Sequence, residues 1–276
     1  MLQALVKMLP LLAASGFAAA QQTAHFHHLH LNSADPAAAI RFYTSRFECD
    51  KATYQGEDAV RAGKAWLLFN KVDAPPPSDL VAALWHFGWG AEDMKSTYQK
   101  QLDLGTRFHT PITDISDLAM RPGFYYAYVD GPDHALIELN TANHHHFGHL
   151  HLFSADPIAA GEWYIGNFGA APRSNRPPSR EPRFYKGFQV GPAMSLMMDD
   201  VNIIIYPKEH ARQSYPDVWK GRDSFAPTKG RVVDHVAFSV KSLADAAQRL
   251  QANGVKVDGK WVEGPDGVLI ELVEER

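Results

Sequence analysis

The chain has 276 residues, of which 45% are hydrophobic and 21% charged, and its formal net charge is −4. This length and composition are typical of a globular protein with room for two domains. The slightly acidic balance gives no electrostatic reason to expect nucleic acid, so we expect a small-molecule partner, and oligomerisation stays open. The single cysteine, Cys49, excludes an intramolecular disulfide and a cysteine-based zinc site.

Residues 1–20 have the pattern of a secretory signal peptide. Lys7 precedes an apolar run at 8–20 that ends in Ala18-Ala19-Ala20, the small-residue ending that signal peptidase requires. The run is shorter than the roughly 20 apolar residues that span a membrane, which favours cleavage over an anchor. We therefore expect a secreted or periplasmic mature protein with no membrane association after cleavage.

Two phrases recur in the same order along the mature chain. His-Leu-His-Leu-Asn-Ser-Ala-Asp-Pro at 28–36 returns at 149–157 with eight of nine positions identical. Gly-Pro-Asp-His-Ala-Leu-Ile-Glu-Leu at 131–139 returns as Gly-Pro-Asp-Gly-Val-Leu-Ile-Glu-Leu at 264–272. Such ordered repetition predicts a duplicated unit, with domains at 21–142 and 143–276.

Each unit divides again into two β-α-β modules. Asp-Pro at the end of the first phrase supplies an N-cap and a first-turn proline, and Ser242 with Asp245 forms a capping box. The four modules are expected to begin near residues 24, 81, 144 and 231. Hydrophobic periodicity predicts helices at 37–47, 94–104, 158–168 and 243–253, and strands at 64–71, 84–90, 201–207 and 232–240. Proline-rich stretches at 73–79 and 171–183 are predicted to be surface loops.

Histidine recurs at one position of every module. Seven residues before each helix N-cap stand His28, His86, His149 and His235. His30 and His151 follow two residues after His28 and His149, on the same strand face. We expect these two additional histidines to line the same cleft as catalytic groups.

This arrangement resembles the vicinal oxygen chelate (VOC) superfamily of glyoxalases, bleomycin-resistance proteins and extradiol dioxygenases. The resemblance implies an α+β fold in which four βαβββ modules form two tandem open barrels. It also implies a metal held by the first-strand histidine of each paired module and a glutamate from the last strand of the second. Carried onto consecutive modules, it predicts two ligand sets, namely His28, His86 and Glu138, and His149, His235 and Glu271.

Two histidines and a carboxylate suit a divalent Fe, Mn, Zn or Ni ion and leave positions open for a substrate. Glyoxalase-type members of the superfamily add a fourth ligand, often a glutamate, from the last strand of the first module. Residues 66–70 and 203–206 contain no carboxylate, which favours dioxygenase-like chemistry on a small substrate with vicinal oxygens. A glyoxalase-like lyase or isomerase, a non-catalytic binding protein of the bleomycin-resistance type, and a metal scavenger stay open as alternatives.

Further expectations concern the surroundings of these sites. The spacing from His86 to Glu138 is 52 residues but from His235 to Glu271 only 36, which predicts a shortened fourth module with little room for a middle hairpin. Tyr126 and Tyr128, with either Trp85 or Trp89, are candidates to face the first cleft. The histidines at 144–146 are predicted to form a solvated linker.

Overall fold

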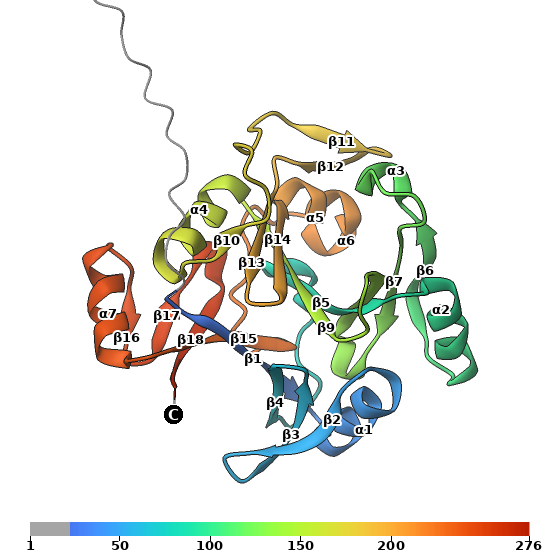
Figure 1. Ribbon diagram of the computed structural model, residues 1–276, viewed down its shortest axis with the longest axis horizontal. Helices are drawn as coiled ribbons and strands as arrows, with labels where there is room; N and C mark the ends of the chain where they lie inside the picture. Colours follow the sequence, from blue (N-terminus) through green and yellow to red (C-terminus); the bar gives the residue numbers. More distant parts are fainter. Residues whose placement is uncertain (1–22, 276) are drawn as a thin grey trace, which may run out of the picture.

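The computed structural model describes residues 23–275, so the predicted signal peptide lies outside the described residues. Most strands of this part of the chain belong to two eight-stranded mixed sheets (Figure 1). The first sheet has the order β16-β17-β18-β15-β1-β4-β3-β2, and the second has the order β10-β13-β14-β9-β5-β8-β7-β6. A separate β11–β12 hairpin accompanies them. Within residues 23–275, no helix combines the length and the apolar character needed to cross a membrane.

The bounds of the elements follow the expected modules. Module 1 contains β1 (His25–Ser33), α1 (Pro36–Arg46), β2 (Asp50–Tyr54), β3 (Glu57–Ala62) and β4 (Ala65–Lys71). Module 2 contains β5 (Leu84–Ala91), α2 (Met94–Asp103), β6 (Phe108–Asp114), α3 (Ser116–Ala119), β7 (Tyr125–Asp130) and β8 (Leu136–Thr141). Module 3 contains β9 (Phe147–Ser154), α4 (Pro157–Phe168), β10 (Ala171–Pro172), β11 (Arg183–Tyr185), β12 (Phe188–Gly191), β13 (Met194–Met198) and β14 (Val201–Pro207). Module 4 contains β15 (Val233–Val240), α7 (Leu243–Ala252), β16 (Val257–Asp258), β17 (Trp261–Glu263) and β18 (Leu269–Glu274).

Short helices occupy the connections. The described part of the chain has three single-turn 3-10 helices, η1 (Asp79–Val81), η2 (Pro132–His134) and η3 (Pro265–Gly267), while α5 (Lys208–Ser214) and α6 (Pro216–Trp219) follow β14. The middle strands of module 4, β16 and β17, are short. The expected shortening of this module is therefore confirmed, although its middle hairpin is present. The stretch predicted as a loop at 171–183 contains β10 and begins β11 at its end.

The main helices begin where the sequence places them. Asp35 accepts from the amide of Ala38 at 3.0 Å, and Asp93 accepts from Ser96 at 3.1 Å. Asp156 caps α4 through two amides, and Ser242 accepts from the amide of Asp245 at 3.2 Å. Each cap satisfies amides that the helix itself leaves unpaired, which fixes the turn between the histidine strand and the helix.

The four-module fold with two open barrels is confirmed, but the predicted pairing of the modules is wrong. β1 pairs antiparallel with β15, and β5 pairs antiparallel with β9, so module 1 joins module 4 and module 2 joins module 3. The linker lengths give a physical reason. Only residues 142–146 separate β8 from β9, so β9 lies beside β5, whereas residues 72–83 carry the chain from the first sheet to the second.

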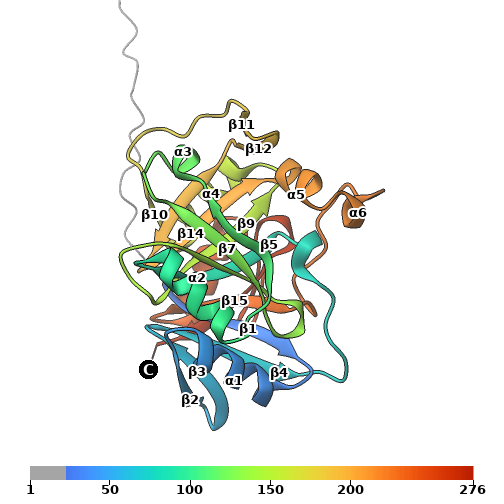
Figure 2. The same ribbon diagram turned by 90° about the vertical axis from the view of Figure 1, so that its right-hand side faces the viewer.

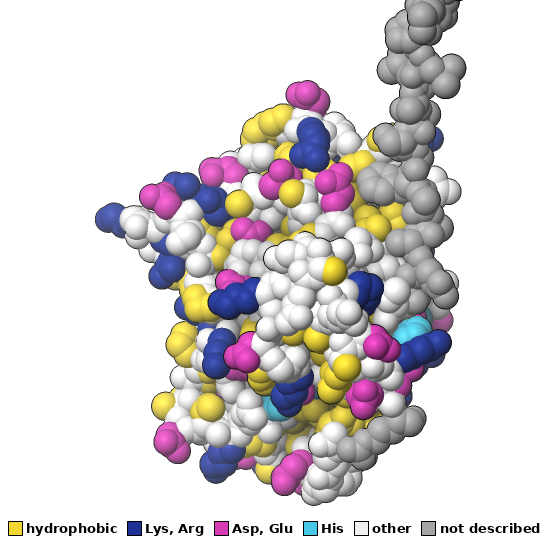
Figure 3. Space-filling view, turned by 90° about the vertical axis from the view of Figure 1, so that its left-hand side faces the viewer, with side chains coloured by type: hydrophobic (Ala, Val, Ile, Leu, Met, Phe, Trp, Pro, Cys, Tyr) yellow, Lys and Arg dark blue, Asp and Glu magenta, His cyan; other side chains and the backbone are white. Residues whose placement is uncertain are grey.

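The two barrels share one hydrophobic core. Phe26 of β1 contacts Phe147 of β9 with ring centroids 5.7 Å apart, and it also contacts Phe238 of β15 at 6.2 Å. In Figure 2, β1, β3, β4 and β15 lie below the strands of the second sheet. Figure 3 shows the face that carries α7, where basic and acidic side chains are intermingled.

Candidate metal centres

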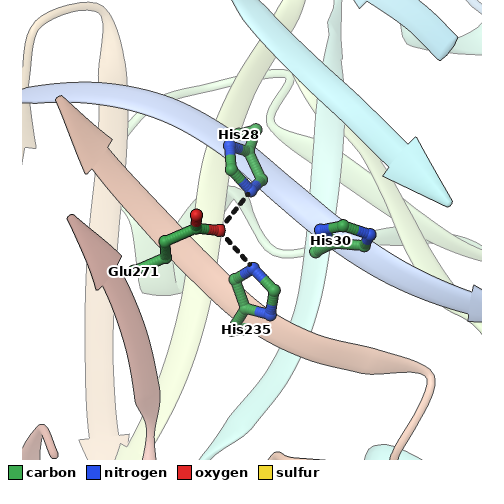
Figure 4. A group of neighbouring side chains, drawn as sticks. All are labelled: His28, His30, His235 and Glu271. Carbon is green, nitrogen blue, oxygen red and sulfur yellow. Dashed lines mark hydrogen bonds and ion pairs between the residues drawn. The ribbon is translucent and has the colours of Figure 1, made fainter. Parts of the chain in front are cut away.

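The first candidate centre lies inside the barrel formed by modules 1 and 4. His28 comes from β1, His235 from β15 and Glu271 from β18, and Figure 4 shows the carboxylate directed at both rings. Glu271 Oε2 lies 2.9 Å from His235 Nε2 and 3.4 Å from His28 Nε2. Ligand atoms of these three residues and of His30 lie within 4.8 Å of one another. This cluster, His28, His30, His235 and Glu271, is called centre A.

The second candidate centre lies inside the barrel formed by modules 2 and 3. His86 Nε2 of β5 lies 2.7 Å from Glu138 Oε2 of β8, and His149 Nε2 of β9 lies 3.6 Å from the same oxygen. Ligand atoms of His86, Glu138 and His151 lie within 4.8 Å of one another. This cluster, His86, Glu138, His149 and His151, is called centre B.

All eight predicted site residues therefore lie in two clusters, but the predicted division between them is wrong. His28 does not join His86 and Glu138, because β1 belongs to the other sheet; His149 takes that place. Likewise, His235 and Glu271 meet His28 and not His149. The role of each residue as a metal ligand or catalytic group stays a prediction.

Strand register brings the rings together. His30 stands opposite His235 across the β1–β15 pair, and His151 stands opposite His86 across the β5–β9 pair. Register shifts beside both pairs bend the ladder locally, a feature that re-aims side chains near functional sites. The two centres are thus built by the same geometry from different parts of the chain.

The buried nitrogens of these rings fit a metal. Among the described residues, His86 Nδ1 and both ring nitrogens of His151 are buried without a polar partner. The Nε2 atoms of His28, His86 and His149 are buried and face only a carboxylate oxygen. A buried polar atom without a partner costs roughly 1–3 kcal/mol, so natural proteins rarely leave several in one place. Neutral imidazoles around a carboxylate are a donor set for Fe, Mn, Zn, Ni or Co. The residues present therefore fit a divalent transition metal.

The protonation states support the same fit. Burial lowers the pKa of His28 and of His86 to about 4, despite the nearby carboxylates. Burial tends to raise the pKa of Glu138, but the charges and hydrogen bonds of His149 and His86 outweigh it and hold that pKa well below its usual range. At neutral pH the two rings are neutral and the carboxylate is ionised, as metal ligation requires.

Centre A has additional charged neighbours. Burial raises the pKa of Glu271, but His235, His28 and Lys260 together lower it well below the ordinary value. Lys260 Nζ lies 2.6 Å from Glu271 Oε1, and Asp234 Oδ1 lies 2.7 Å from His235 Nδ1. The surrounding cleft, of roughly 720 Å³, is lined by several charged side chains, among them Lys229 and Lys256.

Centre B lies in an aromatic cleft of roughly 320 Å³. Trp85 stacks on His151 with centroids 5.5 Å apart, and Tyr206 lies 5.0 Å from the same ring. Tyr128 lies 4.9 Å from His86. The cleft confirms Trp85, Tyr126 and Tyr128 as lining residues, whereas Trp89 is in the core, stacked on Phe47 at 4.5 Å.

Several lining residues escaped the sequence analysis. Tyr185 and Phe188 come from the β11–β12 hairpin, and His210 and Tyr215 come from the α5–α6 segment. Tyr215 accepts from Trp85 Nε1 at 2.9 Å, and its hydroxyl thereby positions the indole. Pro216 after Tyr215 is a helix-start signal that marks this segment, but nothing local indicates which cleft it covers. The linker histidines, predicted to be solvated, are only partly so: His145 is exposed, whereas His144 and His146 are half-buried with ring centroids 3.7 Å apart.

Comparison with known families agrees with this architecture. The model of the glyoxalase/bleomycin resistance protein/dioxygenase superfamily matches residues 25–139 and 146–272. These segments cover most of the chain, which therefore belongs to that superfamily, the VOC superfamily. No curated protein matches the chain in sequence.

Solved structures show the same fold. A mutant of glyoxalase I from Zea mays aligns with a TM-score of 0.66 and 12% identity, covering 92% of this chain and 94% of that chain. Glyoxalase I from Zea mays aligns with a TM-score of 0.64 and 14% identity, covering 92% of this chain and 93% of that chain. A putative dioxygenase from Bacillus subtilis aligns with a TM-score of 0.57 and 11% identity, covering 92% of this chain and 86% of that chain. At these identities the likeness concerns the fold alone.

Proposed function

We propose that this protein is a divalent-metal-dependent enzyme whose active site is centre B. Its substrate is a small, planar molecule carrying two adjacent oxygens. The observation that carries the proposal is the convergence of the buried His86 and His149 rings on Glu138 at an aromatic cleft, beside a His151 ring whose nitrogens have no partner. A divalent metal bound there supplies Lewis acidity for adjacent oxygens of a substrate.

The protein groups around the centre have separable tasks. Phe188, which is 39% exposed, offers an apolar face for a planar ring, while the buried Trp85 backs the cleft. Burial raises the pKa of Tyr206 to about 12 and that of Tyr128 well above its ordinary value, so both phenols stay protonated and can donate hydrogen bonds to substrate oxygens. The enclosing aromatic wall limits water in the cleft, which strengthens those polar contacts.

Strand register favours oxygenation over isomerisation. In module 2, the ligand Glu138 on β8 pairs with Gly88, which comes two residues after the first-strand histidine His86. In module 3, the residue in the same register is the one that pairs with His151, two residues after His149. Ile204 occupies that place, and Leu68 stands opposite His30 in module 1. Neither side chain can act as the carboxylate base of a glyoxalase-type isomerase.

The test uses protein purified without a histidine tag. Elemental analysis should find a bound divalent metal, and oxygen uptake should be seen with a panel of aromatic vicinal diols. Glu138→Gln should abolish turnover, whereas Glu162→Gln, an exposed change on α4, should leave it intact. Isomerisation of a thiohemiacetal without oxygen uptake would replace the oxygenase proposal, and ring binding by metal-free protein without turnover would indicate a binding protein.

A further inference from the structure

We infer that the histidine two residues after the first-strand histidine is a direct metal ligand. Each centre would then hold its ion with three imidazoles and one carboxylate. The inference rests on the proposed function, because it concerns the same metal centres. It differs from the two-histidine, one-carboxylate set of the family resemblance, in which His30 and His151 only line the cleft.

Burial of His151 is the first support. Its ring is 8% exposed, and neither nitrogen has a hydrogen-bond partner. A histidine serving as a structural or positioning group would donate or accept through at least one nitrogen. His210, in the same cleft, does so, because its Nδ1 lies 3.0 Å from the carbonyl oxygen of Gln189.

Distance is the second support. The His151 and His86 rings are 4.6 Å apart between centroids, closer than His86 and His149 at 5.8 Å. A nitrogen of His151 falls within 4.8 Å of ligand atoms on His86 and Glu138. The second histidine is therefore closer to the His86 ring than the first-strand histidine of its module, while His149 Nε2 is the nearer of the two to the carboxylate, at 3.6 Å from Glu138 Oε2.

Repetition in centre A is the third support. His30 and His235 are 4.8 Å apart between centroids, and His30 belongs to the same four-residue group as Glu271. In Figure 4 the His30 ring lies beside His235, on the side away from Glu271. The strands opposite β9 and β1 are β5 and β15, and two residues after their own histidines they carry Gly88 and Ala237. Neither of these strands therefore adds a second ring to its centre. The repeated phrase thus places its second histidine beside the carboxylate cluster in both barrels.

The experiment isolates centre B in a background with His235→Ala and Glu271→Gln, which leaves centre A with only two of its four proposed ligands. Cobalt(II) is titrated into full-length mature protein, and X-ray absorption counts the imidazoles around the ion. His151→Ala should lower the count from three to two and weaken cobalt binding by about 100-fold or more, since even outer partners of a ligand are worth 10–100-fold. His210→Ala is the matched control, and its imidazole count and affinity should not change.

Each outcome is decisive for one claim. An unchanged count and affinity in His151→Ala would overturn the third ligand while leaving the proposed function standing. If the background protein binds no cobalt, the proposed function itself fails. His151→Gln guards against misfolding: with circular dichroism like that of the background protein, it should still lose one imidazole.

Discussion

Gly88 shows how closely centre B is packed at the scale of one residue. A β-carbon added there would lie 2.3 Å from His149 Cε1 and 2.4 Å from the backbone oxygen of Glu138. The corresponding position of centre A is Ala237, which already carries a β-carbon. The His149 ring therefore occupies space that only glycine leaves free.

Gly88→Ala should displace His149, lower the metal content of centre B and destabilise the protein by about 1–3 kcal/mol through overpacking. Gly166→Ala on α4 is the control, because nothing lies within 4 Å of its added carbon. That change should be neutral or stabilise by roughly 0.5–1 kcal/mol. Denaturant unfolding and elemental analysis measure both effects. Full metal content in Gly88→Ala would contradict this close packing.

A single residue, Lys260, also influences how tightly centre A binds a metal ion. Its ammonium contacts Glu271, so it competes with a cation for that carboxylate. Lys260→Gln should tighten metal binding at centre A by a few-fold, a modest effect because the lysine is half exposed and screened. Lys256→Gln, which loses only its pair with Glu263 at 3.0 Å, should leave the affinity unchanged. Isothermal titration in a Glu138→Gln background measures both, and equal affinities would show that Lys260 does not compete.

At the scale of elements, the two repeated phrases contact each other. Ser33, the last residue of β1, donates to Asp133 in η2, and Ser154, the last residue of β9, donates to Asp266 in η3. Both aspartates have positive φ, 54° and 57°. The contacts join module 1 to module 2 and module 3 to module 4, across the two sheets. This mutual contact explains physically why both phrases occur twice.

Asp133→Ala should destabilise the protein by about 1–3 kcal/mol, because it leaves Ser33 and the amide of Ala34 without their acceptor. A double-mutant cycle with Ser33→Ala measures the coupling by denaturant unfolding. Additive effects of the two changes would mean that the serine contact contributes nothing.

Prediction from sequence succeeded for elements specified by neighbouring residues. Asp35, Asp93 and Asp156 mark helix starts through local chemistry, and the histidines seven residues earlier therefore fall on the expected strands. Partner choice between modules was predicted wrongly, because the nearly identical phrases of both halves can pair in more than one way. The α5–α6 segment and the β11–β12 hairpin were missed because their place depends on packing over the cleft.

At the scale of the whole molecule, metal and folding are coupled. Both centres gather ligands from strands distant in sequence, and the unfolded chain offers no such site. Ligand binding to the native state alone stabilises it, by about 2.7 kcal/mol at a hundredfold excess over Kd. Removing metal with a chelator should lower Tm, and adding it back should restore Tm. The double variant Glu138→Gln, Glu271→Gln should show a much smaller response in calorimetry; an undiminished response would place the stabilising ion elsewhere.

The exchange of modules between sheets has a consequence for any attempt to divide the polypeptide. Cleavage within residues 142–146 would leave each fragment with half of the ligands of both centres. The first fragment would keep β1 and β5 without their partners β15 and β9, and the second would keep β9 and β15 without β5 and β1. Neither fragment should bind metal alone, and mixing the two should restore binding through reciprocal complementation. The molecule is therefore one interlocked body, although its primary structure is that of a duplication.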